Sequence, residues 1–196
     1  VALLYLRALI DAGVDNPASR ITLEVTADVD VFATVAKLRA LRHCWATVLE
    51  HMGQPLDSTR IEAVSADRWL TEVDPWVNIL RGTAATLGAV VGGAESVTIA
   101  PFDSASGLPG GLGRRLARNT QLLLQDESGI GRVLDPAGGS SYIESFTDDL
   151  AAAAWKFFQR IEAADGPVDA ADEIGTDIAV VAARRDKDIA TRKRPI

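Results

Sequence analysis

Apolar residues recur along this chain with two spacings, one helical and one extended. Near the N-terminus Leu3, Leu6 and Ile10 follow the helical spacing, and Gly13 stands where a left-handed C-cap would end that helix. Residues 21–26 then alternate apolar and polar side chains and are rich in β-branched types, which is typical of a strand. The chain is therefore predicted to open with a short helix and a strand.

A strand followed by a helix is predicted three times in succession. Each extended pattern leads into an amphipathic one, and Gly or Pro residues separate them. A helix between two strands lets those strands run parallel, so the order predicts parallel βαβ units. The expected strands are 21–26, 60–65 and 96–100, and the expected helices are 32–49, 75–91 and 111–125.

Two more helices are predicted in the last third of the chain, after a candidate fourth strand near 130–133. The residues Ser145 to Asp148 fit a capping box, which predicts a helix from Ser145 to about Ala164. The final helix is expected over 171–190. The core stripe expected on the first of these helices is Phe146, Leu150, Ala154, Phe157 and Ile161, and the final helix is expected to present Ile174, Ile178 and Val181 on one face.

Composition narrows the class of protein. With 196 residues and 47% hydrophobic content, the chain is long enough for a globular domain with a sizeable core. A net charge of -7 argues against a nucleic-acid surface, because phosphate binding requires clustered Lys and Arg. The dense basic cluster at 192–194 is expected to be a solvated tail, with a contact to an acidic partner surface as the alternative.

The sequence carries no signal for a membrane or an oxidising compartment. No apolar run approaches the ~20 residues that span a bilayer, and the N-terminus lacks the features of a secretory signal. The single cysteine, Cys44, cannot form an internal disulfide, so a reducing, cytoplasmic setting is expected. Because the chain begins without Met and within a helical pattern, upstream residues are expected to be missing.

Few residues offer catalytic chemistry. The two histidines, His43 and His51, both fall in the second predicted helix, so neither a hydrolase triad nor a zinc site is expected. The run Gly110 to Gly113 at a helix start resembles a phosphate cradle but lacks the Gly-Lys-Ser/Thr ending of a P-loop, and a structural role is favoured.

Two other features have a structural and a ligand-binding interpretation. The pair Gly138-Gly139 allows a tight turn and is expected to serve a crowded rim of the fold, with close approach to a ligand as the alternative. Trp69 and Trp76 follow a predicted strand and are expected at a protein interface; stacking on a corrin or adenine is the alternative.

Several segments resemble the barrel domain of the adenosylcobalamin-dependent methylmalonyl-CoA mutases. A helical run at 118–128 leads towards the loop Asp-Pro-Ala-Gly-Gly-Ser-Ser-Tyr at 135–142, and both are similar to that domain. Residues 36–42 resemble the family's Ala-Lys-x-Arg-Ala-x-Arg helix. The other similar segments are 70–81, 102–105, Leu108-Pro109 and the exit segment 189–196.

The resemblance implies an α/β fold of the parallel (β/α)8 TIM-barrel type. A complete barrel needs about 250 residues, and this chain provides three clear βα units, so it is expected to form about the second half. Residues 1–165 are assigned to this half barrel, and 166–196 to a C-terminal helix and exit segment. Two open sheet edges and exposed apolar inner strand faces are then expected, to be covered by missing upstream sequence or another chain.

Two loops differ from those of the catalytic mutases. Where those enzymes carry His-Thr-Asn and Gln-Thr-Ser-Gly-Trp, this chain reads Thr98-Ile99-Ala100-Pro101 and, at 64–69, Val-Ser-Ala-Asp-Arg-Trp. Both differences remove polar groups at the C-terminal ends of strands, where this fold builds its active sites. Neither histidine fits the family's cobalt-binding Asp-x-His-x-x-Gly motif, so cobalt ligation is not expected here.

The resemblance therefore implies a fragment of a non-catalytic small (β) subunit of methylmalonyl-CoA mutase. Its expected partner is a large (α) subunit, in a heterodimer that interconverts (R)-methylmalonyl-CoA and succinyl-CoA in propionate metabolism by a radical rearrangement. Adenosylcobalamin is expected on the partner, and no catalytic, cofactor-binding or metal-binding residue is assigned to this chain. The alternative is part of a catalytically active acyl-CoA mutase barrel whose active-site residues lie in a missing N-terminal half. A third hypothesis is a free-standing binding module.

Overall fold

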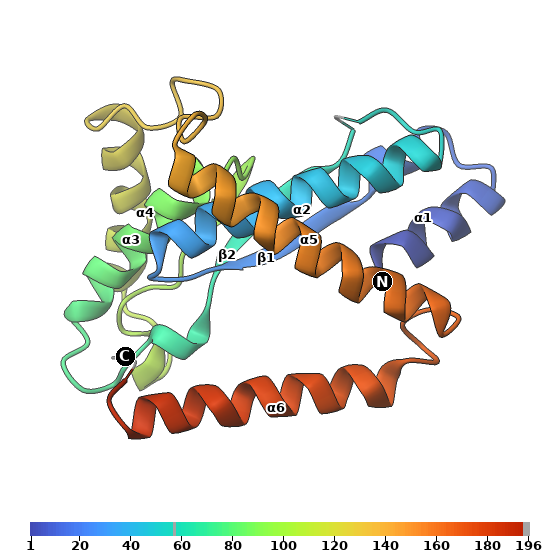
Figure 1. The fold of residues 1–196 in the computed structure, drawn as a ribbon. Helices are drawn as coiled ribbons and strands as arrows, with labels where there is room; N and C mark the ends of the chain where they lie inside the picture. Colours follow the sequence, from blue (N-terminus) through green and yellow to red (C-terminus); the bar gives the residue numbers. More distant parts are fainter. Residues whose placement is uncertain (57, 194–196) are drawn as a thin grey trace. The chain divides into compact units, whose positions relative to one another are not determined.

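The computed structural model describes residues 1–56 and 58–193 (Figure 1). Its three strands form one parallel sheet in the order β1-β2-β3, which confirms the predicted βαβ units. Arg194, the last of the basic cluster, and the end of the exit segment at 195–196 lie outside the described residues. The elements are α1 (Ala2–Asp11), η1 (Pro17–Arg20), β1 (Thr22–Ala27), α2 (Val31–His51), β2 (Arg60–Ser65), η2 (Asp67–Trp69), α3 (Val77–Val91), β3 (Ser96–Thr98), η3 (Ser104–Ser106), α4 (Gly111–Asp126), α5 (Ser141–Ala163) and α6 (Ala171–Ala190), where η marks a short 3-10 helix.

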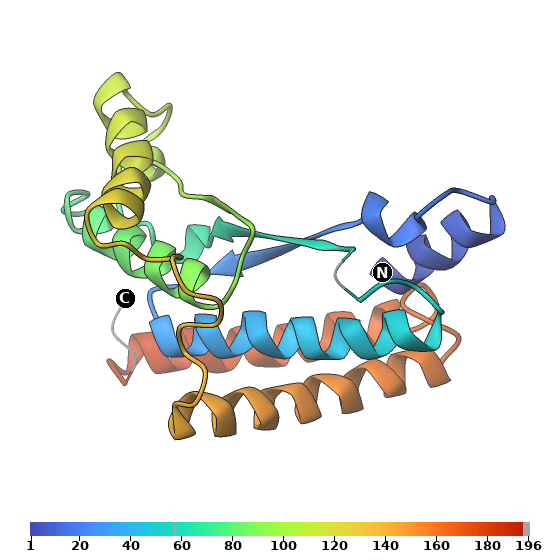
Figure 2. The same ribbon diagram turned by 90° about the horizontal axis from the view of Figure 1, so that it is seen from above.

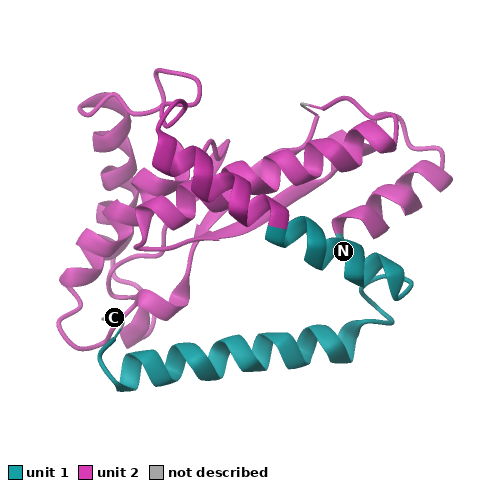
Figure 3. Ribbon diagram, in the orientation of Figure 1, with its two compact units in different colours: residues 1, 153–196 teal, residues 2–152 magenta. Residues whose placement is uncertain are grey.

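The chain divides into two compact units (Figure 3). One comprises residues 2–152 and contains the sheet, α1 to α4 and the first part of α5. The other comprises Val1 and the described residues from Ala153 onward, with the rest of α5 and α6. Within this second unit Arg160 of α5 pairs with Glu173 at 2.8 Å and with Asp177, both on α6.

Local sequence signals set the ends of the first helices. Gly13 and Gly53 have φ values of +67° and +63° just after α1 and α2, the left-handed conformation that a glycine adopts without steric cost. Asp30 caps α2, because its carboxylate accepts a hydrogen bond of 3.0 Å from the backbone N–H of Ala33. These helices therefore begin and end close to where the sequence predicts.

One face of the sheet is buried against α2 and α3. Figures 1 and 2 show α2 running alongside β1 and β2. The helices approach closely because small residues lie between them: a methyl group added at Gly88 would lie 3.1 Å from Cβ of Thr34. The buried apolar cluster comprises Ala27, Ile61 and Ala63 from the strands, Leu38 from α2, Ala85 and Ala89 from α3, and Ala66, Trp69 and Ile99 from the strand-end loops.

The opposite face of the sheet is polar, which corrects the expectation of exposed apolar inner strand faces. In β1 and β3 apolar and polar residues alternate strictly, so the apolar side chains point into the core and most polar ones away from it. In β2 Ile61 and Ala63 point into the core and Arg60 and Glu62 away from it, but Val64 lies on the polar side and Ser65 on the core side. On this face the Thr98 hydroxyl donates a hydrogen bond of 3.2 Å to the Glu62 carboxylate. The exposed side chains of β1 and β3 here are Thr22, Glu24, Thr26, Ser96 and Thr98.

The prediction of a fourth strand near 130–133 is wrong, because these residues form turns and bends. Gly129 and Gly131 have φ values of +64° and +84°, which lie outside the extended region. The apolar run is too short, and the glycines around it too close, for a strand to form. Over the described residues the sheet therefore has three strands.

The start and the buried stripe of α5 also differ from the prediction. The helix begins at Ser141, so the capping-box residues 145–148 lie inside it. In place of that cap, the Glu144 carboxylate accepts a hydrogen bond of 2.9 Å from the Gly139 backbone N–H. The expected stripe is confirmed in part: Ile161 is buried and Phe146 and Leu150 are half-buried, but Ala154 and Phe157 are exposed. Ile143 and Thr147, which the stripe did not include, are buried.

Candidate functional site at the carboxyl ends of the strands

The loops that follow the three strands lie at one edge of the sheet, where parallel α/β folds bind their ligands. Asp28 follows β1, the segment 66–70 follows β2 and the segment 99–103 follows β3. Both segments that differ from the catalytic mutases, 64–69 and 98–101, therefore reach this edge. It is the candidate functional site, and it lies within the first unit.

An ion pair between Asp28 and Arg68 joins the ends of β1 and β2. The Asp28 side chain is buried, with the residue 6% exposed, and its carboxylate also accepts a hydrogen bond of 2.7 Å from the Val29 backbone N–H. The Thr34 hydroxyl bonds both backbone groups of Asp28, at 3.1 Å and 3.2 Å. A buried carboxylate is stable only with such partners. The Asp28 carboxylate therefore finds its partners within this chain.

Lys37 of α2 reaches the same edge. Its ammonium group donates a hydrogen bond to the Thr26 carbonyl oxygen and lies 3.4 Å from the Thr26 hydroxyl. Burial lowers the pKa of Lys37, the neighbouring charge of Arg68 lowers it further, and Asp28 opposes both effects. The three charged groups therefore form one coupled cluster.

Replacing Arg68 with glutamine (R68Q) should raise the pKa of Lys37. The change removes a repulsive positive charge and frees the Asp28 carboxylate to attract the ammonium, so both effects favour the protonated lysine. NMR titration of reductively 13C-methylated protein would show the Lys37 signal titrating at higher pH. Arg60→Gln, at the opposite end of β2, should leave it unchanged; an unchanged or lower pKa in R68Q would contradict the cluster.

The structure separates the two tryptophans that the sequence placed together. Trp69 is a core residue: it is 3% exposed and its indole N–H donates a hydrogen bond of 3.3 Å to the Ala27 carbonyl oxygen. The expectation that it lies at an interface is therefore wrong, because an interface requires an accessible ring. Trp76 is 56% exposed and stacks on Phe102, with ring centroids 4.6 Å apart.

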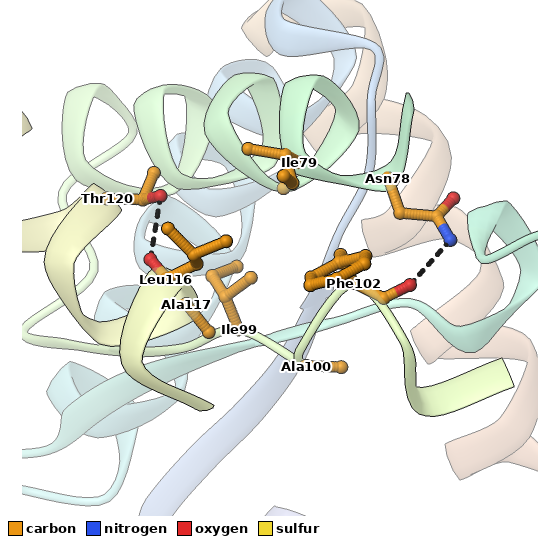
Figure 4. Close-up of a pocket in the computed structure, with 9 residues that line it drawn as sticks. Asn78, Ile79, Ile99, Ala100, Phe102, Leu116, Ala117 and Thr120 are labelled. Atoms are coloured by element: carbon orange, nitrogen blue, oxygen red, sulfur yellow. Dashed lines mark hydrogen bonds between the residues drawn. The ribbon is translucent and has the colours of Figure 1, made fainter. Parts of the chain in front are cut away.

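A buried amide joins the second and third strand-end loops. Asn78 of α3, 2% exposed, donates hydrogen bonds of 2.9 Å to the carbonyl oxygens of Thr71 and Phe102, the latter drawn in Figure 4. Its side-chain oxygen accepts hydrogen bonds from the Thr71 backbone N–H at 3.2 Å and from Arg81 at 2.9 Å. No role is predicted for Asn78 from the sequence; the available signal was a polar side chain on the buried side of a Gly- and Ala-rich helix.

A small cavity lies beside Asn78, between α3, α4 and the segment after β3 (Figure 4). Its volume is ≈ 10 Å³, about the space of one water molecule. The Thr120 hydroxyl on its wall donates to the Leu116 carbonyl oxygen of its own helix at 2.9 Å. The lining residues are Asn78, Ile79, Gly82, Ile99, Ala100, Phe102, Leu116, Ala117 and Thr120.

The chain's own carboxylate occupies the N-terminus of α4. The Gly110 backbone N–H donates a hydrogen bond of 2.8 Å to the Asp103 side chain. That side chain fills the space beside Gly113, where an added methyl group would lie 2.7 Å from Cγ of Asp103. An internal carboxylate thus takes the place at which a helix N-terminus would bind a phosphate, which supports the structural interpretation of the Gly110 to Gly113 run.

Arg39 of α2 organises the loop that contains Gly138 and Gly139. Its guanidinium pairs with Asp135 and, at 2.7 Å, with Glu144. The hydrogen bond from the Gly139 backbone lowers the pKa of Glu144; burial opposes this effect and Arg39 adds to it. At Gly138 an added methyl group would lie 2.9 Å from the Asp135 carboxylate. These contacts support a role within the fold for both glycines.

The histidines and the cysteine lie on α2, away from the strand ends. His43 and His51 are exposed, and the His51 ring nitrogen Nδ1 is 2.8 Å from the Thr47 carbonyl oxygen. The Cys44 thiol lies 3.6 Å from the Ala151 carbonyl oxygen, and burial raises its pKa.

In the ranges 1–56 and 58–193 no three His, Cys, Asp or Glu side chains are grouped as a metal site. In the same ranges no helix combines the length and hydrophobicity to cross a membrane.

Comparison with known proteins gives a consistent family match. The sequence profile of the family described as methylmalonyl-CoA mutase matches residues 1–196. The methylmalonyl-CoA mutase small subunit of Streptomyces virginiae is 49% identical over 98% of this chain and 32% of its own length. The small subunit of Propionibacterium freudenreichii subsp. shermanii is 46% identical over 98% and 31%. The mitochondrial methylmalonyl-CoA mutase of Bos taurus is 40% identical over 86% and 23%. The chain thus spans about one third of the length of these small subunits.

Proposed function

This chain belongs to the methylmalonyl-CoA mutase family, and we propose that it forms part of a small subunit without catalytic groups of its own. The partner is a large subunit that interconverts (R)-methylmalonyl-CoA and succinyl-CoA and carries the adenosylcobalamin, in a cytoplasmic heterodimer. The identity of 46–49% to proteins named small subunits supports this assignment.

The observation that carries the proposal is the state of the polar groups at the strand ends. Asp28 is paired with Arg68, the Ser65 hydroxyl accepts a hydrogen bond of 2.9 Å from the Ala100 backbone N–H, and Asp103 is bonded to Gly110. An active site holds polar groups ready for its substrate. Here these groups bond neighbouring loops to one another, as expected of side chains that stabilise the fold and bind no substrate.

The barrel assignment is part of the same proposal. The parallel strands with α2 and α3 on one face have the layer order of a (β/α)8 barrel, and three strands correspond to about half of one. We assign residues 1–165 to its second half and 166–196 to an exit segment. The polar face of the sheet would then face the barrel interior.

Adenosylcobalamin does not fit the residues at this edge. A cobalt ligand of the imidazole type is required, and both histidines of the chain lie on the exposed side of α2. The side chains of Asp28, Ser65 and Asp103 at the strand ends are ion-paired or bonded to the backbone. No step of the radical reaction is therefore assigned to this chain.

The second candidate is a catalytically active mutase barrel, favoured by the 38% identity to the methylmalonyl-CoA mutase of Escherichia coli (strain K12). Activity and binding assays distinguish the two. The protein should form a complex with a methylmalonyl-CoA mutase large subunit on size-exclusion chromatography and should show no mutase turnover alone with adenosylcobalamin present. Turnover by the protein alone would overturn the proposal and favour the active barrel.

A further inference from the structure

We propose that Val73, Trp76 and Leu80 form the surface through which this protein docks on a basic-rimmed apolar pocket of the large subunit. This inference rests on the proposed function and adds the place and chemistry of the contact. The three residues, named here the Trp76 patch, are 85%, 56% and 71% exposed. Large apolar side chains grouped on a surface are typical of protein interfaces.

The three side chains come from one short stretch of chain. Trp76 immediately precedes α3, and Leu80 lies four residues further on, so both lie on the same side of the helix start. Val73 belongs to the loop that leads into this helix. The Trp76 ring is supported by Phe102, with an angle of 21° between the ring planes. Along the chain, the aromatic Trp76 thus has an exposed aliphatic residue on either side, Val73 before it and Leu80 after it.

The patch is held rigidly from below. Asn78 bonds both the Thr71 backbone, at the start of the loop, and the Phe102 carbonyl oxygen, next to the supporting ring. The Val77 backbone N–H donates a hydrogen bond of 3.1 Å to the Asp74 carbonyl oxygen and closes the turn into α3. A surface that is already ordered loses little entropy on binding. The exposure of Trp76 thus belongs to a fixed structure.

The charges beside the patch define the partner. Glu72 and Asp74 flank Val73 and are exposed, and the 196 residues together carry a net charge of -7. Such a surface repels phosphate-bearing ligands and anionic membranes. It complements a protein surface that offers an apolar pocket with Lys or Arg at its rim, because opposite charges steer association. A large tryptophan at the centre of such a contact is the usual anchor.

Binding to the purified large subunit, followed by biolayer interferometry, tests the patch. Leu80→Ser and Trp76→Ala should each weaken the affinity by about tenfold or more. The double variant Glu72→Lys/Asp74→Lys should slow association and reverse its salt dependence. The matched control is Leu123→Ser, which removes a leucine 58% exposed on α4 and should bind like the parent protein. Circular dichroism and urea midpoints equal to those of the parent protein identify the variants that remain folded.

The outcomes separate this inference from the proposed function. If the parent protein binds the large subunit and folded Leu80→Ser and Trp76→Ala bind equally well, the patch is not the interface and the proposed function stands. If the parent protein does not bind at all, the proposed function fails and the inference with it. If the parent protein forms a homodimer that Leu80→Ser dissociates, the occupant is a second copy and the inference is overturned.

Discussion

Asn78→Ala should lower the free energy of unfolding by about 3 kcal/mol, the largest effect expected for a single side chain at the strand ends. The substitution leaves the Thr71 and Phe102 carbonyl oxygens and the Thr71 backbone N–H without their partner. Buried polar groups without a partner lose their interaction with water and gain nothing in return. Urea unfolding followed by circular dichroism measures the difference.

The control for this prediction is Asn119→Ala. Asn119 is exposed on α4, so its replacement should change stability by no more than about 0.5 kcal/mol. If Asn78→Ala is as mild as the control, the loops after β2 and β3 do not depend on this amide.

Gly113→Ala should destabilise the protein by about 2 kcal/mol, whereas Gly111→Ala on the same helix should be neutral or slightly stabilising. A methyl group at Gly113 overlaps the Asp103 carboxylate and displaces it from the start of α4, but nothing lies within 4 Å of a methyl group at Gly111. Because alanine is the better helix former, any loss at Gly113 is due to the overlap.

A double-mutant cycle with Asp103→Ala isolates this overlap. Asp103→Ala alone should cost about 1 kcal/mol, as loss of a helix cap does. In Asp103→Ala/Gly113→Ala the added methyl group has room, so the combined loss should be smaller than the sum of the two single losses. Additive losses would show that Asp103 does not occupy the N-terminus of α4.

Elements with strong local signals were predictable from the sequence alone. The extended pattern of β2 and the apolar periodicity of α6 predict the bounds that the structure has, Arg60–Ser65 and Ala171–Ala190. The start of α5 was not predictable in this way. It depends on Glu144, whose carboxylate binds Gly139 and also Arg39, a residue 105 positions earlier in the chain.

The position of the candidate site in the fold was predictable from the sequence, but the contacts between its side chains were not. The segments around Ser65 and Ala100 were expected at strand ends and lie there. Their partners are residues distant in sequence: Arg68 meets Asp28 across 40 positions. The burial of Trp69 depends on the sheet and α3 together. Spacing along the chain carries no information about such contacts.

The most direct test of the central claim, that the strand-end side chains stabilise the fold and take no part in the reaction, is the kcat/KM of the reconstituted heterodimer. Arg68→Gln and Ser65→Ala in this chain should leave kcat/KM within about twofold of the parent complex once assembly is matched by size-exclusion chromatography. A fall of about 100-fold in kcat/KM with assembly unchanged would contradict the claim, because a loss of that size is typical of a group that stabilises the transition state.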